Sequence, residues 1–148
     1  MRVFEAVLDP TVLKTLTDMS ADWEAENSCY GYRKNERSDI EGNRIFLAEE
    51  GAEIIGYLFG HTATASKSSS IIADGEAYFE IEELYVKPEH RSCGIGRALF
   101  DFAENAVSDE VGMLMLSTVT KNYRAILHFY IDEMDMQFWS ARLYKRIK

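Results

Sequence analysis

The chain has 148 residues, of which 47% are hydrophobic, so it is long and apolar enough to bury a core, and we expect one domain over residues 1–148. This composition excludes a disordered chain, which lacks the apolar side chains that packing requires. With 25 acidic and 16 basic residues the net charge is −9, which excludes non-specific binding to nucleic acid and is compatible with a cationic small molecule, a basic peptide or no charged partner.

The first part of the sequence predicts a strand followed by an acidic helix. Residues 2–8 have the composition of a strand, and Asp9 followed by Pro10 has the form of an N-cap with a proline in the first helical turn. Apolar side chains then recur at helical spacing to Trp23. The polar segment 31–43 is expected to be a loop or a short second helix.

The middle of the sequence predicts a strand–turn–strand pair and a long strand. Residues 43–50 and 52–65 are the paired strands, separated by Gly51. The polar, serine-rich segment 66–75 ends in Asp-Gly and is expected to be a mobile loop closing into a turn. Residues 77–86 form the next predicted strand.

The last part predicts two helices and two strands, which gives a mixed α/β arrangement. One helix runs from a glycine turn to about Val107, and another covers roughly residues 123–134. Residues 112–119 are almost all apolar, as expected for a strand that is covered on both faces. The segment 138–147 is expected to close the chain as a strand.

Targeting and cysteine patterns favour a cytoplasmic protein without a metal. The N-terminus has no signal-peptide pattern, and no run of about 18 apolar residues offers a membrane span. The chain has only two cysteines, Cys29 and Cys93, and they are far apart in the sequence. Free thiols therefore fit better than a disulfide framework or a metal site.

The stretch HRSCGIGRALF, residues 90–100, places two glycines between a strand and a helix. Unpaired N–H groups at such a helix start, together with the helix dipole, form a cradle for phosphate or pyrophosphate. Arg91 and Arg97 add positive charge, although a plain tight turn remains an alternative. A Walker loop is excluded because no Lys-Ser or Lys-Thr follows, and a dinucleotide loop because the third glycine is missing.

The spacing R-x-x-G-x-G, from Arg91 to Gly96, resembles the acetyl-CoA-binding signature of the GNAT N-acetyltransferase superfamily. The strand EELYVKPEHR, the glycine turn with its helix, the strand LMLSTV and the segment NYRAILHFY also occur in that family's order. The resemblance implies an α/β GNAT fold. Its central sheet would be mixed but mostly antiparallel, with six to seven strands, helices on both faces and splayed central parallel strands.

The resemblance also implies how acetyl-CoA would be held. Backbone N–H groups from Ser92 to Ala98 should cradle the pyrophosphate, Leu84–Val86 should pair with the pantetheine arm, and Asn122 should contact pantetheine. Ser92 stands where the family usually has glycine, and no chemistry is assigned to Cys93. The expected cofactor-binding residues are Leu84, Tyr85, Val86, Arg91, Ser92, Cys93, Gly94, Ile95, Gly96, Arg97, Ala98 and Asn122.

Tyr130 matches the family's tyrosine near the thioester sulfur, where its hydroxyl would act as general acid. The segment departs from the family pattern, because Tyr130 follows Ala125 by five positions rather than four. Either the helix carries a bulge, or Phe129 partly takes the position of the family's tyrosine. The alternative is that Phe129 and Tyr130 only pack in the core.

The strand FEIEELYV resembles the corresponding strand of diamine acetyltransferases, and the match places the base that deprotonates the amine at Glu82. Strand alternation places Glu80 on the face of Glu82 and turns Glu83 away, unless a bulge shifts the phase. Glu80, Glu83 and His61 remain alternative bases.

The expected function is transfer of acetyl from acetyl-CoA to a primary amine by direct attack in a ternary complex. A small polyamine-like or aminoglycoside-like acceptor is favoured, because carboxylates and aromatic side chains of the first helical region suit a cation. The expected acceptor-binding residues are Asp22, Trp23, Glu26 and Tyr30. A protein or peptide amine, or a CoA-binding sensor module without turnover, are the alternatives, and a homodimer is a candidate assembly.

Overall fold

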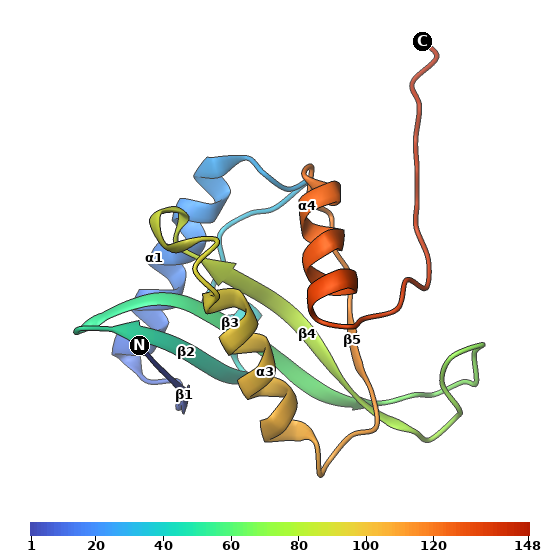
Figure 1. Cartoon of the computed structure of the whole chain (residues 1–148), viewed down its shortest axis with the longest axis horizontal. Helices are drawn as coiled ribbons and strands as arrows, with labels where there is room; N and C mark the ends of the chain where they lie inside the picture. The colour runs from blue at the N-terminus through green and yellow to red at the C-terminus, as the bar shows by residue number, and fades with distance from the viewer.

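Five strands form one mixed sheet in the computed structural model, which describes residues 1–148 (Figure 1). Their order in the sheet follows the chain: β1 (Arg2–Ala6), β2 (Arg44–Glu50), β3 (Glu53–Thr64), β4 (Ala77–Val86) and β5 (Leu114–Leu116). Neighbouring strands are antiparallel except β4 and β5, which are parallel. The predicted fold class is confirmed, with five strands in place of the six to seven expected.

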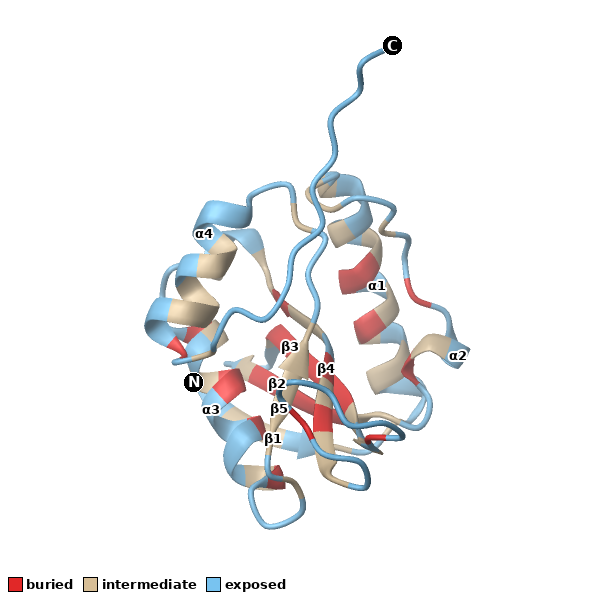
Figure 2. Ribbon diagram, turned by 90° about the vertical axis from the view of Figure 1, so that its right-hand side faces the viewer, coloured by how far each residue is buried: buried red, intermediate tan, exposed pale blue.

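Helices cover both faces of this sheet (Figure 2). The helices are α1 (Pro10–Glu26), the short α2 (Arg37–Ile40), α3 (Ile95–Val107) and α4 (Tyr123–Leu127), which continues as a π-helix over His128–Glu133. A 3-10 turn over Pro88–His90 leads from β4 toward α3. The predicted cap of α1 is confirmed, because the Asp9 carboxylate accepts the Val12 N–H at 2.7 Å. None of these helices is long and apolar enough to cross a membrane.

Two apolar clusters attach the helices to the sheet. The cluster beneath α1 and α2 includes Leu16, Met19, Ile40, Tyr57 and Phe59. The cluster beneath α3 includes Phe46, Leu58, Phe79, Leu99 and Phe100. Because α3 is held firmly against the sheet, the turn at its N-terminus has a fixed position relative to the end of β4.

The central parallel strands separate after a short contact, as the family resemblance implies. Pairing between β4 and β5 covers only three residue pairs and ends at Ile81 and Leu116. The chain beyond β5 instead meets the segment after α1, where the Tyr30 N–H donates to the Val119 carbonyl at 3.0 Å. The end of β4 therefore has a strand neighbour, β3, on one side only.

Two predicted strands differ from the structure. Residues 112–119 were expected to be covered on both faces, but β5 is only three residues long and half-buried, because its outer edge has no neighbour. Residues 138–147 were expected to form a strand, but they are exposed and have no ladder partner, and the C-terminus points away from the sheet in both views (Figures 1 and 2). A strand requires a second backbone, and no other segment of the chain forms backbone hydrogen bonds with this one.

Candidate active site

The glycine turn before α3 presents a row of free backbone donors. Six successive N–H groups, from Ser92 to Arg97, donate to no acceptor in the protein. The first helical hydrogen bond runs from the Ala98 N–H to the Gly94 carbonyl at 3.0 Å, so Ala98, which was expected in the cradle, has no free donor. Free N–H groups at a helix start attract an anion, and this turn therefore fits the pyrophosphate of CoA.

The backbone of the turn twice enters the left-handed region. Gly94, the N-cap of α3, has φ +81°, and Ser92 has φ +60°. A side chain in the left-handed region is strained, and Ser92 carries this strain. The strain explains why the related family usually has glycine at the position of Ser92. At Gly96 an added Cβ would lie 3.4 Å from the Phe129 ring, so the helical segment carrying Phe129 packs closely on the first turn of α3.

The two arginines that flank the turn are held by other partners. Arg91 donates from Nη2 to both carboxylate oxygens of Glu26, at 2.8 and 3.0 Å, and from Nε to the Val86 carbonyl at 2.8 Å. Arg97 donates from Nη2 to the Glu133 carbonyl at 2.9 Å. They consequently fasten the turn to α1, to β4 and to the end of the π-helix.

Glu26 is therefore engaged, although the sequence placed it among the acceptor-binding residues. Its carboxylate also accepts the Tyr85 hydroxyl at 2.9 Å. Trp23 stacks against Tyr85, with ring centroids 5.2 Å apart, and its second aromatic neighbour is Tyr32 at 4.4 Å. Of the expected acceptor residues, only Asp22 and Tyr30 are exposed.

A β-bulge in β4 changes the direction of its carboxylates. Ile81 pairs with Gly60 and Glu83 pairs with Phe59, so Glu82 lies between them without a partner in β3. Ile81 packs under α3, whereas Glu83 bonds to groups on the α1 and α2 side. Simple alternation, which turned Glu83 away from Glu80, is wrong here because the extra residue shifts the phase.

Glu82 lies at the surface beside a histidine. One of its carboxylate oxygens is 3.3 Å from Nδ1 of His61, and 44% of the Glu82 side chain is exposed. The same His61 nitrogen is 3.3 Å from Oδ1 of Asn43. Glu80 pairs with His61 across the strands, and burial raises the pKa of Glu80, with the negative charge of Glu82 adding to the effect. Two of the alternative bases thus lie beside Glu82.

Glu83 lies deeper, in a polar cluster without a cation. Its carboxylate accepts the Tyr57 hydroxyl at 2.7 Å, the Asn35 amide at 2.9 and 3.0 Å, and the Tyr32 hydroxyl at 3.3 Å. Ser20 of α1 completes the cluster, 2.8 Å from the Tyr32 hydroxyl. Burial raises the pKa of Glu83, and the hydrogen bonds from Tyr57, Asn35 and Tyr32 oppose this effect. The sequence did not single out Tyr57 or Asn35, because only the tertiary fold brings them to Glu83.

Tyr130 occupies the π-helix after α4, so the extra residue in this segment is absorbed by a bulge in the helix. Its ring contacts Phe129 and Phe100, with centroids 5.0 and 6.3 Å away. Burial raises its pKa to about 12, and no protein group forms a hydrogen bond with its hydroxyl. The hydroxyl therefore stays protonated at neutral pH and is available to a ligand.

The other expected cofactor residues lie around the gap between β4 and β5. Leu84, Tyr85 and Val86 follow the point where the β4–β5 pairing ends. Asn122 is exposed at the start of α4, where its carbonyl accepts the Ile126 N–H at 3.2 Å. A cavity of about 500 Å³ lies elsewhere, between α1 and the β2–β3 hairpin, and includes no residue of the turn.

The sequence matches the family described as the acetyltransferase (GNAT) family over residues 12–134. No curated protein sequence matches the chain significantly. Solved structures do match. An aminoglycoside acetyltransferase from an uncultured soil metagenomic sample, in complex with trehalose, is 13% identical with a TM-score of 0.71, covering 99% of this chain and 96% of that one.

Two further structures resemble the whole chain. An aminoglycoside N-acetyltransferase in complex with CoA is 12% identical, with a TM-score of 0.68 and 99% of both chains covered. A ribosomal-protein-alanine N-acetyltransferase from Brucella melitensis biovar Abortus is 14% identical, with a TM-score of 0.67, covering 99% of this chain and all of that one. At these identities the likeness shows the fold.

The family match extends over most of the chain and includes the free N–H groups of the glycine turn. The chain therefore belongs to the GNAT acetyltransferase family, and it is an acetyl-CoA-dependent N-acetyltransferase.

Proposed function

We propose that the protein transfers the acetyl group to a primary amine of a small cationic molecule, of the polyamine or aminoglycoside kind, in the cytoplasm. The observation that carries this proposal is the bulge in β4, which turns Glu83 to the side of Glu80 and leaves Glu82 exposed between them. The charge of Glu82 acts on Glu80, and no arginine or lysine is bonded to Glu80, Glu82 or Glu83, so this part of β4 favours a cation. Two structural neighbours are aminoglycoside acetyltransferases, which supports this acceptor class.

In this proposal acetyl-CoA brings the reactive thioester, and the chain's own groups hold it. The N–H groups from Ser92 to Arg97 bind the pyrophosphate, and the backbone of Leu84–Val86 extends along the pantetheine arm, which Asn122 also contacts. The short pairing of β4 with β5 supports this assignment, because the arm needs the space where the two strands part.

Glu82 is the proposed base. A lysine-like amine has a pKa near 10.4, so its neutral form costs about 4.6 kcal/mol at pH 7, and a nearby base must take the proton. Glu82 is exposed and reachable through a water molecule, and His61, 3.3 Å away, can pass the proton onward. The half-buried Glu80 adds negative charge beside them.

Tyr130 is the proposed acid. Its ring is fixed by Phe100 and Phe129, and its hydroxyl is protonated and makes no hydrogen bond to the protein. A hydroxyl held in this way donates a hydrogen bond, and then a proton, to the departing sulfur.

A thiol-release assay tests the acceptor class. The protein would be incubated with acetyl-CoA and separate pools of polyamines, aminoglycosides and peptides with a free N-terminal alanine. We expect release with a polyamine or an aminoglycoside, and a loss of at least tenfold in kcat/KM in Glu82→Gln. Asp101→Asn, an exposed carboxylate on α3, is the matched control and should keep the wild-type rate.

Two results would overturn the proposal. Release with peptides alone would move the acceptor to a protein amine, the class named for one structural neighbour. Tight CoA binding without release in any pool would favour a sensor module.

A further inference from the structure

Asn43 is held in one orientation by the end of α2. It directly precedes β2, and its backbone N–H donates to the Ile40 carbonyl at 3.2 Å. Its side-chain Nδ2 donates to the carbonyls of Asp39 and Ile40, both at 3.1 Å. An amide oxygen only accepts hydrogen bonds, so turning the amide over would set Oδ1 against two other acceptors. The side chain of Asn43 is therefore fixed with Nδ2 toward α2, and Oδ1 is free for another partner.

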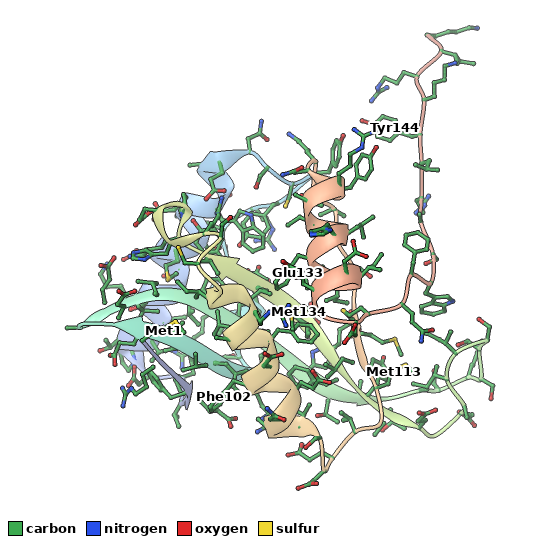
Figure 3. All side chains as sticks on the ribbon, viewed as in Figure 1. Met1, Phe102, Met113, Glu133, Met134 and Tyr144 are labelled. Carbon is green, nitrogen blue, oxygen red and sulfur yellow. The ribbon has the colours of Figure 1, made fainter.

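This oxygen of Asn43 contacts the histidine beside the proposed base. Strands β3 and β4 run side by side (Figure 3), and His61 of β3 pairs with Glu80 of β4. Nδ1 of His61 forms a hydrogen bond with Oδ1 of Asn43 at 3.3 Å, and an oxygen of the Glu82 carboxylate is equally close to Nδ1. Both neighbours are acceptors while Glu82 is charged, so the hydrogen bond requires a hydrogen on Nδ1.

A hydrogen on Nδ1 leaves the other ring nitrogen as the acceptor. A neutral imidazole has one N–H and one lone pair, so the lone pair of His61 lies on Nε2. The side chains of His61 and Glu82 are 41% and 44% exposed, and their contact is an ion-pair distance without a hydrogen bond. Asn43, which is anchored to α2, is therefore the group that fixes the ring of His61.

The charges around His61 favour a positive ring. Glu80 lies across from it in β4, and the carboxylate of Glu82 is 3.3 Å from Nδ1. The nearest basic residue along the chain, Arg44, bonds instead to the carboxylate of Glu5, at 2.8 and 3.0 Å. A proton that reaches Nε2 is therefore stabilised by two neighbouring carboxylates.

We propose that Asn43 is a positioning residue for acetyl transfer: it keeps the hydrogen of His61 on Nδ1, so that Nε2 accepts the proton that Glu82 takes from the amine. The inference rests on the proposed function, in which Glu82 is the base. The proton passes from the ammonium group to Glu82, and from Glu82 through water to Nε2. The ring then has a hydrogen on each nitrogen and one positive charge, and release of the Nε2 hydrogen to bulk water restores the neutral ring.

Nitrogen NMR of the histidine rings tests the position of the hydrogen without any acceptor, because a ring nitrogen with hydrogen and one without it have distinct signals. The chain has three histidines, and the signals of His61 are those missing from His61→Gln. At a pH high enough that the signals no longer change, we expect the hydrogen on Nδ1 in the wild type. In Asn43→Leu a second population with hydrogen on Nε2 should appear, whereas Asn43→Asp, which still offers an acceptor, should keep it on Nδ1.

The same two variants separate positioning from a structural role. Both lose the hydrogen bonds from Nδ2 to α2, so both should lower the melting temperature to a similar extent. Only Asn43→Leu also loses the acceptor for Nδ1 of His61. With acetyl-CoA and either spermidine or kanamycin as the acceptor, kcat/KM should fall about tenfold in Asn43→Leu, and Asn43→Asp should restrict the loss to about threefold.

Three results would overturn the inference: hydrogen on Nε2 in the wild type, an Asn43→Leu ring that keeps the wild-type signals, or equal losses of kcat/KM in the two variants. The last result would make Asn43 only a cap of α2. Absence of thiol release with every acceptor would instead refute the proposed function, and the ring signals would still decide whether Asn43 fixes the hydrogen of His61.

Discussion

Replacing Tyr57 by phenylalanine removes one oxygen from the centre of the Glu83 cluster. Tyr57 is 0% exposed, and its hydroxyl donates to the Glu83 carboxylate at 2.7 Å. A hydrogen bond to a charged group contributes about 1.5–3 kcal/mol, and Tyr57→Phe should lower the free energy of unfolding by that amount at pH 7. For a chain of this length the melting temperature should fall by roughly 3–12 °C.

The loss should depend on pH in a defined direction. Burial raises the pKa of Glu83 above its ordinary value, so the folded protein holds this proton more tightly than the unfolded chain does. The resulting stability is present below about pH 4 and is lost as the pH rises through the folded-state pKa. Tyr57→Phe removes a donor that favours the charged form, which raises the pKa of Glu83 further. The variant should therefore lose more stability at pH 7 than at pH 4.

Urea unfolding at both pH values, followed by circular dichroism, measures the effect. Tyr32→Phe is the comparison: it removes the bond to Ser20 and a longer bond to Glu83, at 3.3 Å, so the pH-dependent part of its loss should be smaller. In a Glu83→Gln background the cost of Tyr57→Phe should fall to about 1 kcal/mol, the value of a neutral hydrogen bond. Equal losses at both pH values and in both backgrounds would refute the reasoning.

Three further substitutions test the turn and the acid. Ser92→Gly should raise the free energy of unfolding by about 0.5–1 kcal/mol, because the relief of a left-handed serine exceeds the added chain entropy; an unchanged melting temperature would contradict this. Gly96→Asp should abolish CoA binding in calorimetry without unfolding the chain, since it places a carboxylate among the free N–H groups and against Phe129; unaltered affinity would exclude the cradle. Tyr130→Phe should lower kcat by on the order of 10²-fold with little change in KM for acetyl-CoA, and a normal kcat would assign the proton to another donor.

The features that the sequence predicts well are set by local chemistry. Asp9 caps α1 and the Gly94 turn starts α3, because caps and left-handed turns depend on a few adjacent residues. The separation of β4 from β5 followed from the family resemblance, and the structure confirms it. The turn is therefore recognisable as a candidate binding site from its own residues, without knowledge of its distant neighbours.

The features that escaped prediction depend on partners far away in sequence. The bulge at Glu82 exists only in the pairing of β4 with β3, so alternation along β4 alone turned Glu83 to the wrong face. The cluster around Glu83 likewise joins α1, the segment before α2, and β3. Residues 138–147 have strand propensity, but a strand also requires a neighbouring backbone, and propensity does not supply one.

The two proposed catalytic residues lie at two one-residue irregularities, and this is a stronger argument for the site than either motif alone. Glu82 is the unpaired residue of the β4 bulge, and Tyr130 lies in the π-helix that follows α4. Each irregularity interrupts regular backbone hydrogen bonding and persists only where surrounding contacts hold it, here Glu83 beside the bulge and Phe100 against Tyr130. The Tyr57 hydroxyl holds Glu83, and Glu83 lies beside the bulge that carries Glu82. Tyr57→Phe should therefore lower kcat/KM as well as stability, and it should shift the pH profile of kcat/KM. A change that only loosened the core would leave that profile in its wild-type position.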